Sequence, residues 1–135
     1  MIRRITLSSA LLILLLTGAC IQTQSGGEYE VTVAQVREKL NSGEDIVLLD
    51  VRTVSEYTGP LGHVDSSLLI PLNDLESRIG ELEKFRDKEI IVICRTGINS
   101  GSATKILREN NFKAFNMLGG MVEWNNQHSE DKKEE

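Results

Sequence analysis

The sequence predicts an α/β domain in which a mainly parallel sheet of about five strands is covered by helices on both faces. Between residues 29 and 127, short apolar runs alternate with segments of helical spacing. The run Ile90–Ile93 is apolar throughout, as is typical of parallel strands buried on both faces. Strands and helices that alternate in this way build parallel sheets through right-handed crossovers.

The first half of the domain is expected to begin with a strand and a capped helix. Tyr29–Val31 opens the sheet, and Thr32 then caps a helix with Gln35 in the capping-box position. That helix ends at residues 41–43, an Asn-Ser-Gly sequence that favours a stop. The apolar run at residues 46–51 predicts the next buried strand.

The second half is expected to alternate in the same way. Its elements are a helical turn at 55–57, a strand at 68–70, a helix over 72–85 with a break near Gly80, the central strand at 90–93, a helix at 102–109, a strand at 114–117 and a short helix through Trp124. Residues 128–135 are rich in charge and are expected to form a disordered tail.

Residues 1–19 predict an export signal that is not part of the fold. Arg3 and Arg4 give a positive start, and an apolar run at 7–16 follows. A comfortable membrane span needs about 20 apolar residues, and this run is shorter. Residues 20–28 are then expected to be a flexible tether between the membrane and the domain.

The sequence Thr17-Gly18-Ala19-Cys20 resembles the lipobox of bacterial lipoproteins. The resemblance implies cleavage after Ala19 and a lipid on Cys20, which would place the protein in the cell envelope on the periplasmic or extracytoplasmic face of a membrane. Thr17 stands where that motif usually has Leu, so cleavage by an ordinary signal peptidase stays open. An uncleaved anchor with a chance cysteine is the third interpretation.

Charge and cysteine content exclude several classes of function. The chain has 20 acidic and 15 basic residues, a net charge of −5, and this balance argues against nucleic-acid binding. If Cys20 carries lipid, Cys94 has no partner for a disulfide within the domain. The two histidines, His63 and His128, are not spaced with a cysteine as metal ligands, so no metal site is expected.

Cys94 is the candidate nucleophile. It follows the strand at 90–93 and faces a helix across a loop that contains Gly97. N–H groups at the amino end of a helix favour negative charge, and a thiol placed there is more acidic than a free thiol. The thiolate is the nucleophilic form, so this position favours catalysis over the alternative of a buried apolar thiol.

Six motifs are similar to those of single-domain rhodaneses, in the same order and at similar spacing. They are Leu49-Asp50-Val51-Arg52, Glu56-Tyr57, Gly62-His63-Val64, Ile70-Pro71-Leu72, Cys94-Arg95-Thr96-Gly97 and Leu118-Gly119-Gly120-Met121 with Trp124. Rhodanese-like domains carry sulfane sulfur as a cysteine persulfide, and many transfer it from thiosulfate to cyanide or to another thiol. The resemblance implies that fold and activity for about residues 30–127.

The resemblance also implies roles for single residues. Cys94 would accept the sulfur, and the substrate would be bound by the loop and helix start that follow: Arg95, Thr96, Gly97, Ile98, Asn99 and Ser100. Ser100 could donate to the sulfur or cap the helix, and the cap is the favoured interpretation. Four residues near the site are expected to be structural: Asp50, Arg52, Glu56 and His63. Arg52 is expected to pair with Glu56, and His63 to be a hydrogen-bonded loop residue.

Two departures from the family pattern bear on the substrate. Asn99 stands where the family often has a second arginine, which weakens the case for thiosulfate and leaves room for a polysulfide or a protein persulfide. Asp65-Ser66-Ser67 replaces the usual Pro-Gly-Ala, so that loop is expected to shape the pocket rim differently.

The sequence therefore predicts an exported sulfurtransferase or sulfur carrier that needs no cofactor. Its partners would be a small sulfur-containing anion or persulfide as donor, a thiol or cyanide as acceptor, and a membrane. A cysteine phosphatase is disfavoured, because Ser100 stands where those enzymes place the arginine that binds phosphate. A non-catalytic module that binds a partner or senses redox state stays open.

Overall fold

The computed structural model describes the backbone of residues 27–131 and the side chains of residues 27–127. The expected signal at 1–19, Cys20 and most of the tether lie outside these residues. Five strands form one all-parallel sheet in the order β1-β5-β4-β2-β3, which confirms the expected α/β class. The strands are β1 (Glu30–Val31), β2 (Val47–Asp50), β3 (Leu68–Leu69), β4 (Glu89–Ile93) and β5 (Lys113–Met117).

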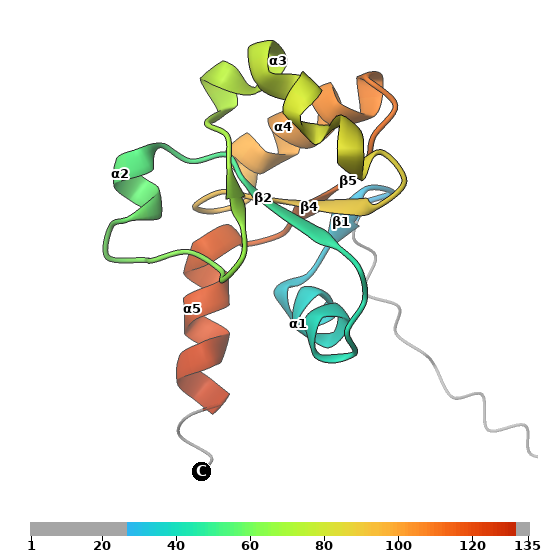
Figure 1. The fold of residues 1–135 in the computed structure, drawn as a ribbon. Helices are drawn as coiled ribbons and strands as arrows, with labels where there is room; N and C mark the ends of the chain where they lie inside the picture. The colour runs from blue at the N-terminus through green and yellow to red at the C-terminus, as the bar shows by residue number, and fades with distance from the viewer. Residues whose placement is uncertain (1–26, 132–135) are drawn as a thin grey trace, which may run out of the picture.

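Helices cover both faces of the sheet (Figure 1). One layer holds α3 and α4, and the opposite layer holds α1 and α5. The helices are α1 (Val33–Asn41), α2 (Val54–Tyr57), α3 (Leu75–Arg78), α4 (Ile98–Glu109) and α5 (Gly120–Asp131), with 3-10 turns η1 (Leu72–Asp74) and η2 (Ile79–Phe85). The expected capping box of Thr32 and Gln35 is present at the start of α1.

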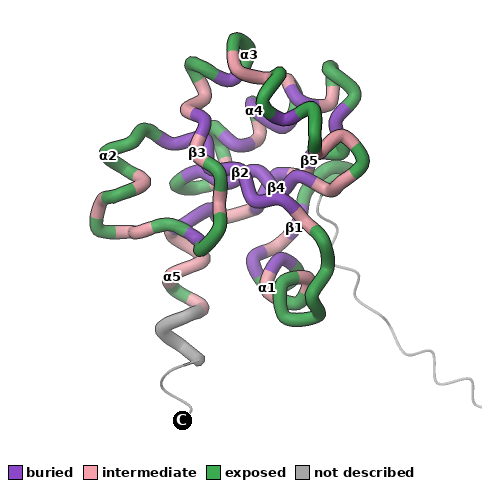
Figure 2. The backbone as a smooth tube through the Cα atoms, viewed as in Figure 1, coloured by how far each residue is buried: buried purple, intermediate pink, exposed green. Residues whose placement is uncertain are grey.

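The central strand β4 divides the core into two clusters. Ile90 and Val92 pack toward α3, η2 and α4, whereas Ile91 and Ile93 pack toward α1 and α5. All four side chains are fully buried, and each such burial stabilises the fold by about 1.5–3 kcal/mol. Figure 2 shows this buried centre, with exposed residues gathered in the loops and the outer faces of helices.

Three elements differ from the sequence prediction. The helix expected over residues 72–85 is one turn of α-helix between two 3-10 segments, and its ends lack side-chain caps. Gly80 lies in the second of these segments, and glycine weakens a regular helix. Helix α4 begins at Ile98 and not at 102, because Gly97 adopts a left-handed conformation (φ 99°) that turns the chain directly into the helix.

The last helix is longer than the sequence prediction, which ended it near Trp124 and began a disordered tail at residue 128. Helix α5 continues to Asp131. Part-buried side-chain hydrogen bonds support the helix beyond Trp124, since Asn125 donates to the carbonyls of Leu61 and Met121 and Gln127 donates to Glu123. Within the described part of the chain, no helix has the length and apolar character needed to cross a membrane.

Candidate active site

Cys94 lies at the carboxyl end of β4, the position that the sequence indicated. Its side chain is 2 % exposed, and the chain then turns through residues 95–97 into α4. Gly97 is required at this turn, because an added Cβ would lie 3.2 Å from the backbone nitrogen of Gly119 in addition to the strain of its positive φ. The turn therefore depends on close packing between the Cys94 loop and the segment that precedes α5.

Several donors converge on the sulfur of Cys94. The N–H of Gly97 and the hydroxyl of Ser100 both donate to Sγ at 3.1 Å. Burial by itself raises the pKa of the Cys94 thiol. The Ser100 hydroxyl and the N–H groups of residues 96, 97 and 100 stabilise the thiolate more strongly, so the pKa lies below its ordinary value of 9.0. The arrangement produces a buried but acidic thiol.

Ser100 is a donor to the sulfur and does not cap α4. Gly97 occupies the cap position, and Ser100 lies within the first turn of the helix with its side chain fully buried. The favoured interpretation of Ser100 as a cap was wrong, because α4 begins four residues earlier than the sequence suggested. With the helix starting at Ile98, the Ser100 hydroxyl points inward to Cys94 and not to the end of the helix.

The first turn of α5 holds the Cys94 loop from the other side. The N–H of Met121 donates to the carbonyl of Cys94 at 2.9 Å, and the N–H of Val122 donates to the carbonyl of Arg95 at 3.1 Å. Gly120 precedes them with φ 55°, and a Cβ at this position would overlap the carbonyl groups of Cys94 and Arg95. The glycine pair that precedes Met121 thus has a structural reason that the sequence did not reveal.

The other residues predicted to bind substrate are on the surface around the loop. Arg95, Thr96 and Asn99 are exposed, and Ile98 is 76 % exposed. A cavity of about 350 Å³ lies beside the loop and is lined by Arg52, Glu56, Pro60, Leu61 and Arg95. Of the predicted substrate-binding residues, Arg95 is the one that lines this cavity.

Asp50 and Arg52 form a buried ion pair after β2. Arg52 Nη2 donates to Asp50 Oδ2 at 2.7 Å, and the backbone N–H of Arg52 donates to Asp50 Oδ1 at 3.0 Å. The guanidinium also donates to the carbonyl of Gly62 at 2.7 Å. The expected pairing of Arg52 with the Glu56 carboxylate was wrong, because Arg52 reaches only the backbone carbonyl of Glu56, at 3.2 Å.

The Glu56 carboxylate instead closes a capping box at the start of α2. It accepts from the N–H of Thr53 at 3.1 Å and from the Thr53 hydroxyl at 2.8 Å. These hydrogen bonds lower the pKa of Glu56, and the charges of Arg52 and Arg95 lower it further. Glu56 therefore places a stable negative charge at the cavity beside Arg95.

His63 is a hydrogen-bonded loop residue, as expected. Its Nδ1 lies 3.1 Å from the carbonyl oxygen of Tyr57, and its ring stacks on the Tyr57 ring at 3.9 Å between centroids. Tyr57 in turn donates to the carbonyl of Ser67 at 2.9 Å, so the two rings tie together the loops that follow α2. Among the side chains of residues 27–127, no group of three or more His, Cys, Asp and Glu is arranged to hold a metal ion.

Asn116 is a site residue for which the sequence gave no signal. Its Oδ1 accepts from the Ser100 hydroxyl at 2.6 Å, and both side chains are buried. The parallel register of β4 and β5 sets Asn116 opposite Val92, two residues before Cys94. This register is a tertiary property, so a single sequence could not reveal the contact.

Comparisons with known proteins agree with the fold. The model of the rhodanese-like domain family matches residues 32–127. The chain is 35 % identical over 95 residues to a protein of Bacillus subtilis named "Putative sulfurtransferase YtwF", covering 70 % of this chain and 88 % of that one. It is 32 % identical over 96 residues to "Putative sulfur carrier protein YrkF" of the same organism, covering 70 % of this chain and half of that one.

A solved structure titled as a human single-domain sulfurtransferase, TSTD1, superimposes with a TM-score of 0.62. It is 27 % identical in sequence, and the match covers 73 % of this chain and 96 % of the human chain. The family match and the names of these relatives support a role in sulfur transfer. The chain belongs to the rhodanese-like domain family.

Proposed function

We propose that this protein is a sulfurtransferase or sulfane-sulfur carrier that forms a persulfide on Cys94. The observation that carries the proposal is the convergence of Gly97 N–H and Ser100 hydroxyl on Cys94 Sγ, both at 3.1 Å, at the end of the central strand. Hydrogen-bond donors at Sγ stabilise the Cys94 thiolate both when it attacks the sulfur donor and when it leaves as the sulfur is passed on.

The transfer has two displacements. The Cys94 thiolate attacks the outer sulfur of the donor, a new S–S bond forms, and the donor's S–S bond breaks with its electron pair leaving on the donor remnant. That remnant is sulfite when the donor is thiosulfate, or a shorter polysulfide or a thiolate for other donors. An acceptor thiolate or cyanide then attacks the outer sulfur, and the Cys94 thiolate leaves. No external oxidant is needed, and a thiolate that is already ionised needs no general base.

Charges at the neighbouring cavity favour a donor of low charge. The guanidinium of Arg52 is neutralised by the buried Asp50 carboxylate. Two other charged residues line the cavity, and the positive charge of Arg95 is balanced by the negative charge of Glu56. A dianion such as thiosulfate meets little net positive charge there, and Asn99 adds none. We therefore propose a singly charged donor, either a protein persulfide or a polysulfide in its singly protonated form, in preference to the thiosulfate dianion.

Intact mass spectrometry with peptide mapping tests the proposal. The protein is incubated with thiosulfate or with polysulfide, and mapping separates Cys94 from Cys20. We expect one added sulfur atom at Cys94, faster with polysulfide, and complete loss of the adduct in Cys94→Ser. If neither donor adds sulfur to a folded wild-type protein, the non-catalytic binding or redox-sensing module becomes the better account.

We also propose that the protein is exported and anchored to a membrane of the cell envelope by lipid on Cys20. The support is the sequence alone: a positive start, a short apolar run and the lipobox-like residues 17–20. Fractionation of the producing bacterium should place the wild-type protein with membranes, and Cys20→Ser should release it or leave it uncleaved. A Cys20→Ser variant that is still cleaved and membrane-bound would contradict the lipid anchor.

A further inference from the structure

The hydroxyl of Ser100 lies within hydrogen-bond distance of two acceptors but has one proton. Its oxygen is 3.1 Å from Cys94 Sγ and 2.6 Å from Asn116 Oδ1. A hydroxyl donates one hydrogen bond at a time, so Ser100 cannot serve both acceptors at once. All three side chains are at least nine-tenths buried, which limits the competition from bulk water.

We propose that Asn116 is a positioning residue whose side-chain oxygen competes with Cys94 Sγ for the single hydroxyl proton of Ser100 and so restrains the ionisation of Cys94. The inference rests on the proposed role of Cys94 as the reactive thiol. Asn116 does not touch the sulfur in this arrangement; it acts through Ser100. While the Ser100 proton points to Asn116, the sulfur keeps only its backbone donors.

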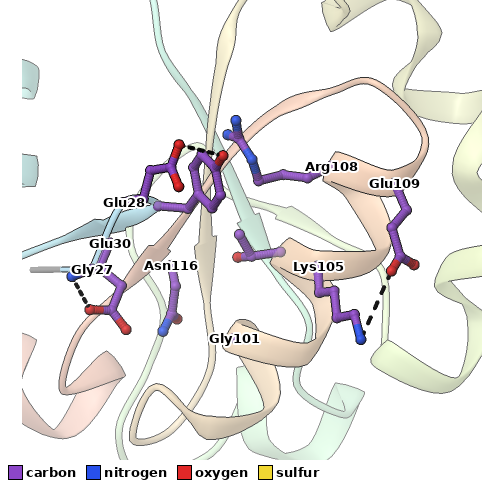
Figure 3. Close-up of a pocket in the computed structure, with 10 residues that line it drawn as sticks. Gly27, Glu28, Glu30, Gly101, Lys105, Arg108, Glu109 and Asn116 are labelled. Carbon is purple, nitrogen blue, oxygen red and sulfur yellow. Dashed lines mark hydrogen bonds and ion pairs between the residues drawn. The ribbon is translucent and has the colours of Figure 1, made fainter.

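The surroundings of Asn116 fit this role. Asn116 also lines a cavity of about 580 Å³ between β1 and α4 (Figure 3). Gly101 of α4 lies next to the Asn116 carboxamide, and a Cβ at this position would lie 3.5 Å from Asn116 Nδ2. Asn116 is thus bonded to Ser100 and lines open space, so truncating it would enlarge an existing cavity instead of opening a new one.

Charged groups around the network are held by other contacts. The charged residues that line this cavity are Glu28, Glu30, Lys105, Arg108 and Glu109. Lys105 lies 3.9 Å from Glu109, Arg108 stacks over Tyr29 and donates to the carbonyl of Ala114, and Glu30 accepts from the N–H of Gly27. At the cavity beside the Cys94 loop, the charged groups are Arg52 with its partner Asp50, Glu56 and Arg95. None of these is altered in the variants below, so their effects cancel in each comparison.

The test is the rate of Cys94 alkylation by iodoacetamide as a function of pH, with peptide mapping to exclude Cys20. Asn116→Ala frees the Ser100 proton for the sulfur, so the thiol pKa should fall and alkylation below it should be roughly threefold to tenfold faster. Asn116→Asp, an ionised acceptor, should raise the pKa and slow alkylation. Thr104→Val is the matched control: Thr104 is buried, lines the same cavity, and its hydroxyl has no partner among the described residues, so the rate should stay unchanged.

Both substitutions are repeated in the Ser100→Ala background. If the effect passes through the hydroxyl, Asn116→Ala should have no effect there, and Asn116→Asp should keep only the part due to its charge. A higher pKa in Asn116→Ala would show that the carboxamide turns its NH₂ group toward Ser100, and an equal shift without the hydroxyl would show a direct effect; either result overturns the proposal. If Asn116→Ala does not fold by circular dichroism, the Asn116→Asp pair decides. Alkylation needs no sulfur donor, so a failure of sulfur loading leaves this test intact.

Discussion

The carbonyl oxygen of Cys94 accepts a hydrogen bond from the N–H of Met121 at 2.9 Å. The candidate nucleophile is therefore held through its backbone by the first turn of α5, as well as through its sulfur by α4. Two helices on opposite faces of the sheet meet at one residue. The position of Cys94 depends on how closely the backbone of α5 can approach the loop, which leads to the first prediction.

Gly120→Ala should destabilise the protein by roughly 3 kcal/mol or more, because the new Cβ combines the strain of a positive φ with overlap of the Cys94 and Arg95 carbonyls. Gly43→Ala is the matched control. Gly43 has a similar φ of 75° but nothing within 4 Å, so it should cost about 1–2 kcal/mol from backbone strain. Urea unfolding measures both, and equal losses would show that the overlap is relieved at no cost.

Ser100→Ala should raise the pKa of the Cys94 thiol, because it removes a hydroxyl that donates to Sγ at 3.1 Å inside the protein. Alkylation below the pKa should slow by about tenfold, the value of one hydrogen bond to a charged group. Ser102→Ala, on the exposed side of the same helix, should leave the rate unchanged. A rate equal to that of the wild type in Ser100→Ala would mean that the backbone donors alone set the acidity.

Asp50→Asn should cost about 3–5 kcal/mol in the free energy of unfolding, because it leaves the buried Arg52 guanidinium without its counter-charge. Asp45 provides the control. It also pairs with a basic residue, Lys88, at 2.7 Å, but its side chain is 77 % exposed. Asp45→Asn should cost less than about 1 kcal/mol. Similar losses in the two variants would show that the Asp50–Arg52 pair adds nothing specific to stability.

Stability should rise with pH over a range that depends on Cys94. The pKa of the Cys94 thiol in the folded protein lies below 9.0, whereas the unfolded chain keeps the ordinary value. Between these two values the unfolded state binds more protons, so the free energy of unfolding increases with pH. The gain is complete above the unfolded pKa and is lost as pH falls through the folded pKa.

Cys94→Ser removes this titration and is the reference. The difference in unfolding free energy between the wild type and Cys94→Ser, measured by urea unfolding at a series of pH values under reducing conditions, should grow as pH approaches 9.0 and then level off. A difference that stays flat, or that shrinks toward alkaline pH, would mean that folding does not favour the thiolate.

The sheet and the position of the nucleophile could be predicted because both depend on local sequence. The apolar run of β4, the cysteine that ends it and the glycine that turns the chain are adjacent in the sequence. The register of β4 against β5 is different. It pairs Val92 with Asn116 and brings Asn116 to Ser100. The residues next to Asn116 in the sequence do not predict that contact.

Two errors in the site came instead from local backbone geometry and from burial. Ser100 seemed to be a cap because a serine at a helix start is usually one, and the true start at Ile98 depends on the φ of 99° at Gly97. Arg52 was expected to pair with Glu56 in a structural ion-pair network. The closer partner is Asp50, which lies two residues before it at the end of a buried strand, where an uncompensated carboxylate would be costly.

The 2 % exposure of Cys94 limits which molecules can reach its sulfur. A sulfur atom so enclosed is a poor target for large oxidants. A second sulfur bonded to it would extend the side chain by about 2 Å, the length of an S–S bond. An acceptor would then contact the outer sulfur before it could contact Cys94 Sγ. In the protein without bound sulfur, Sγ would stay buried.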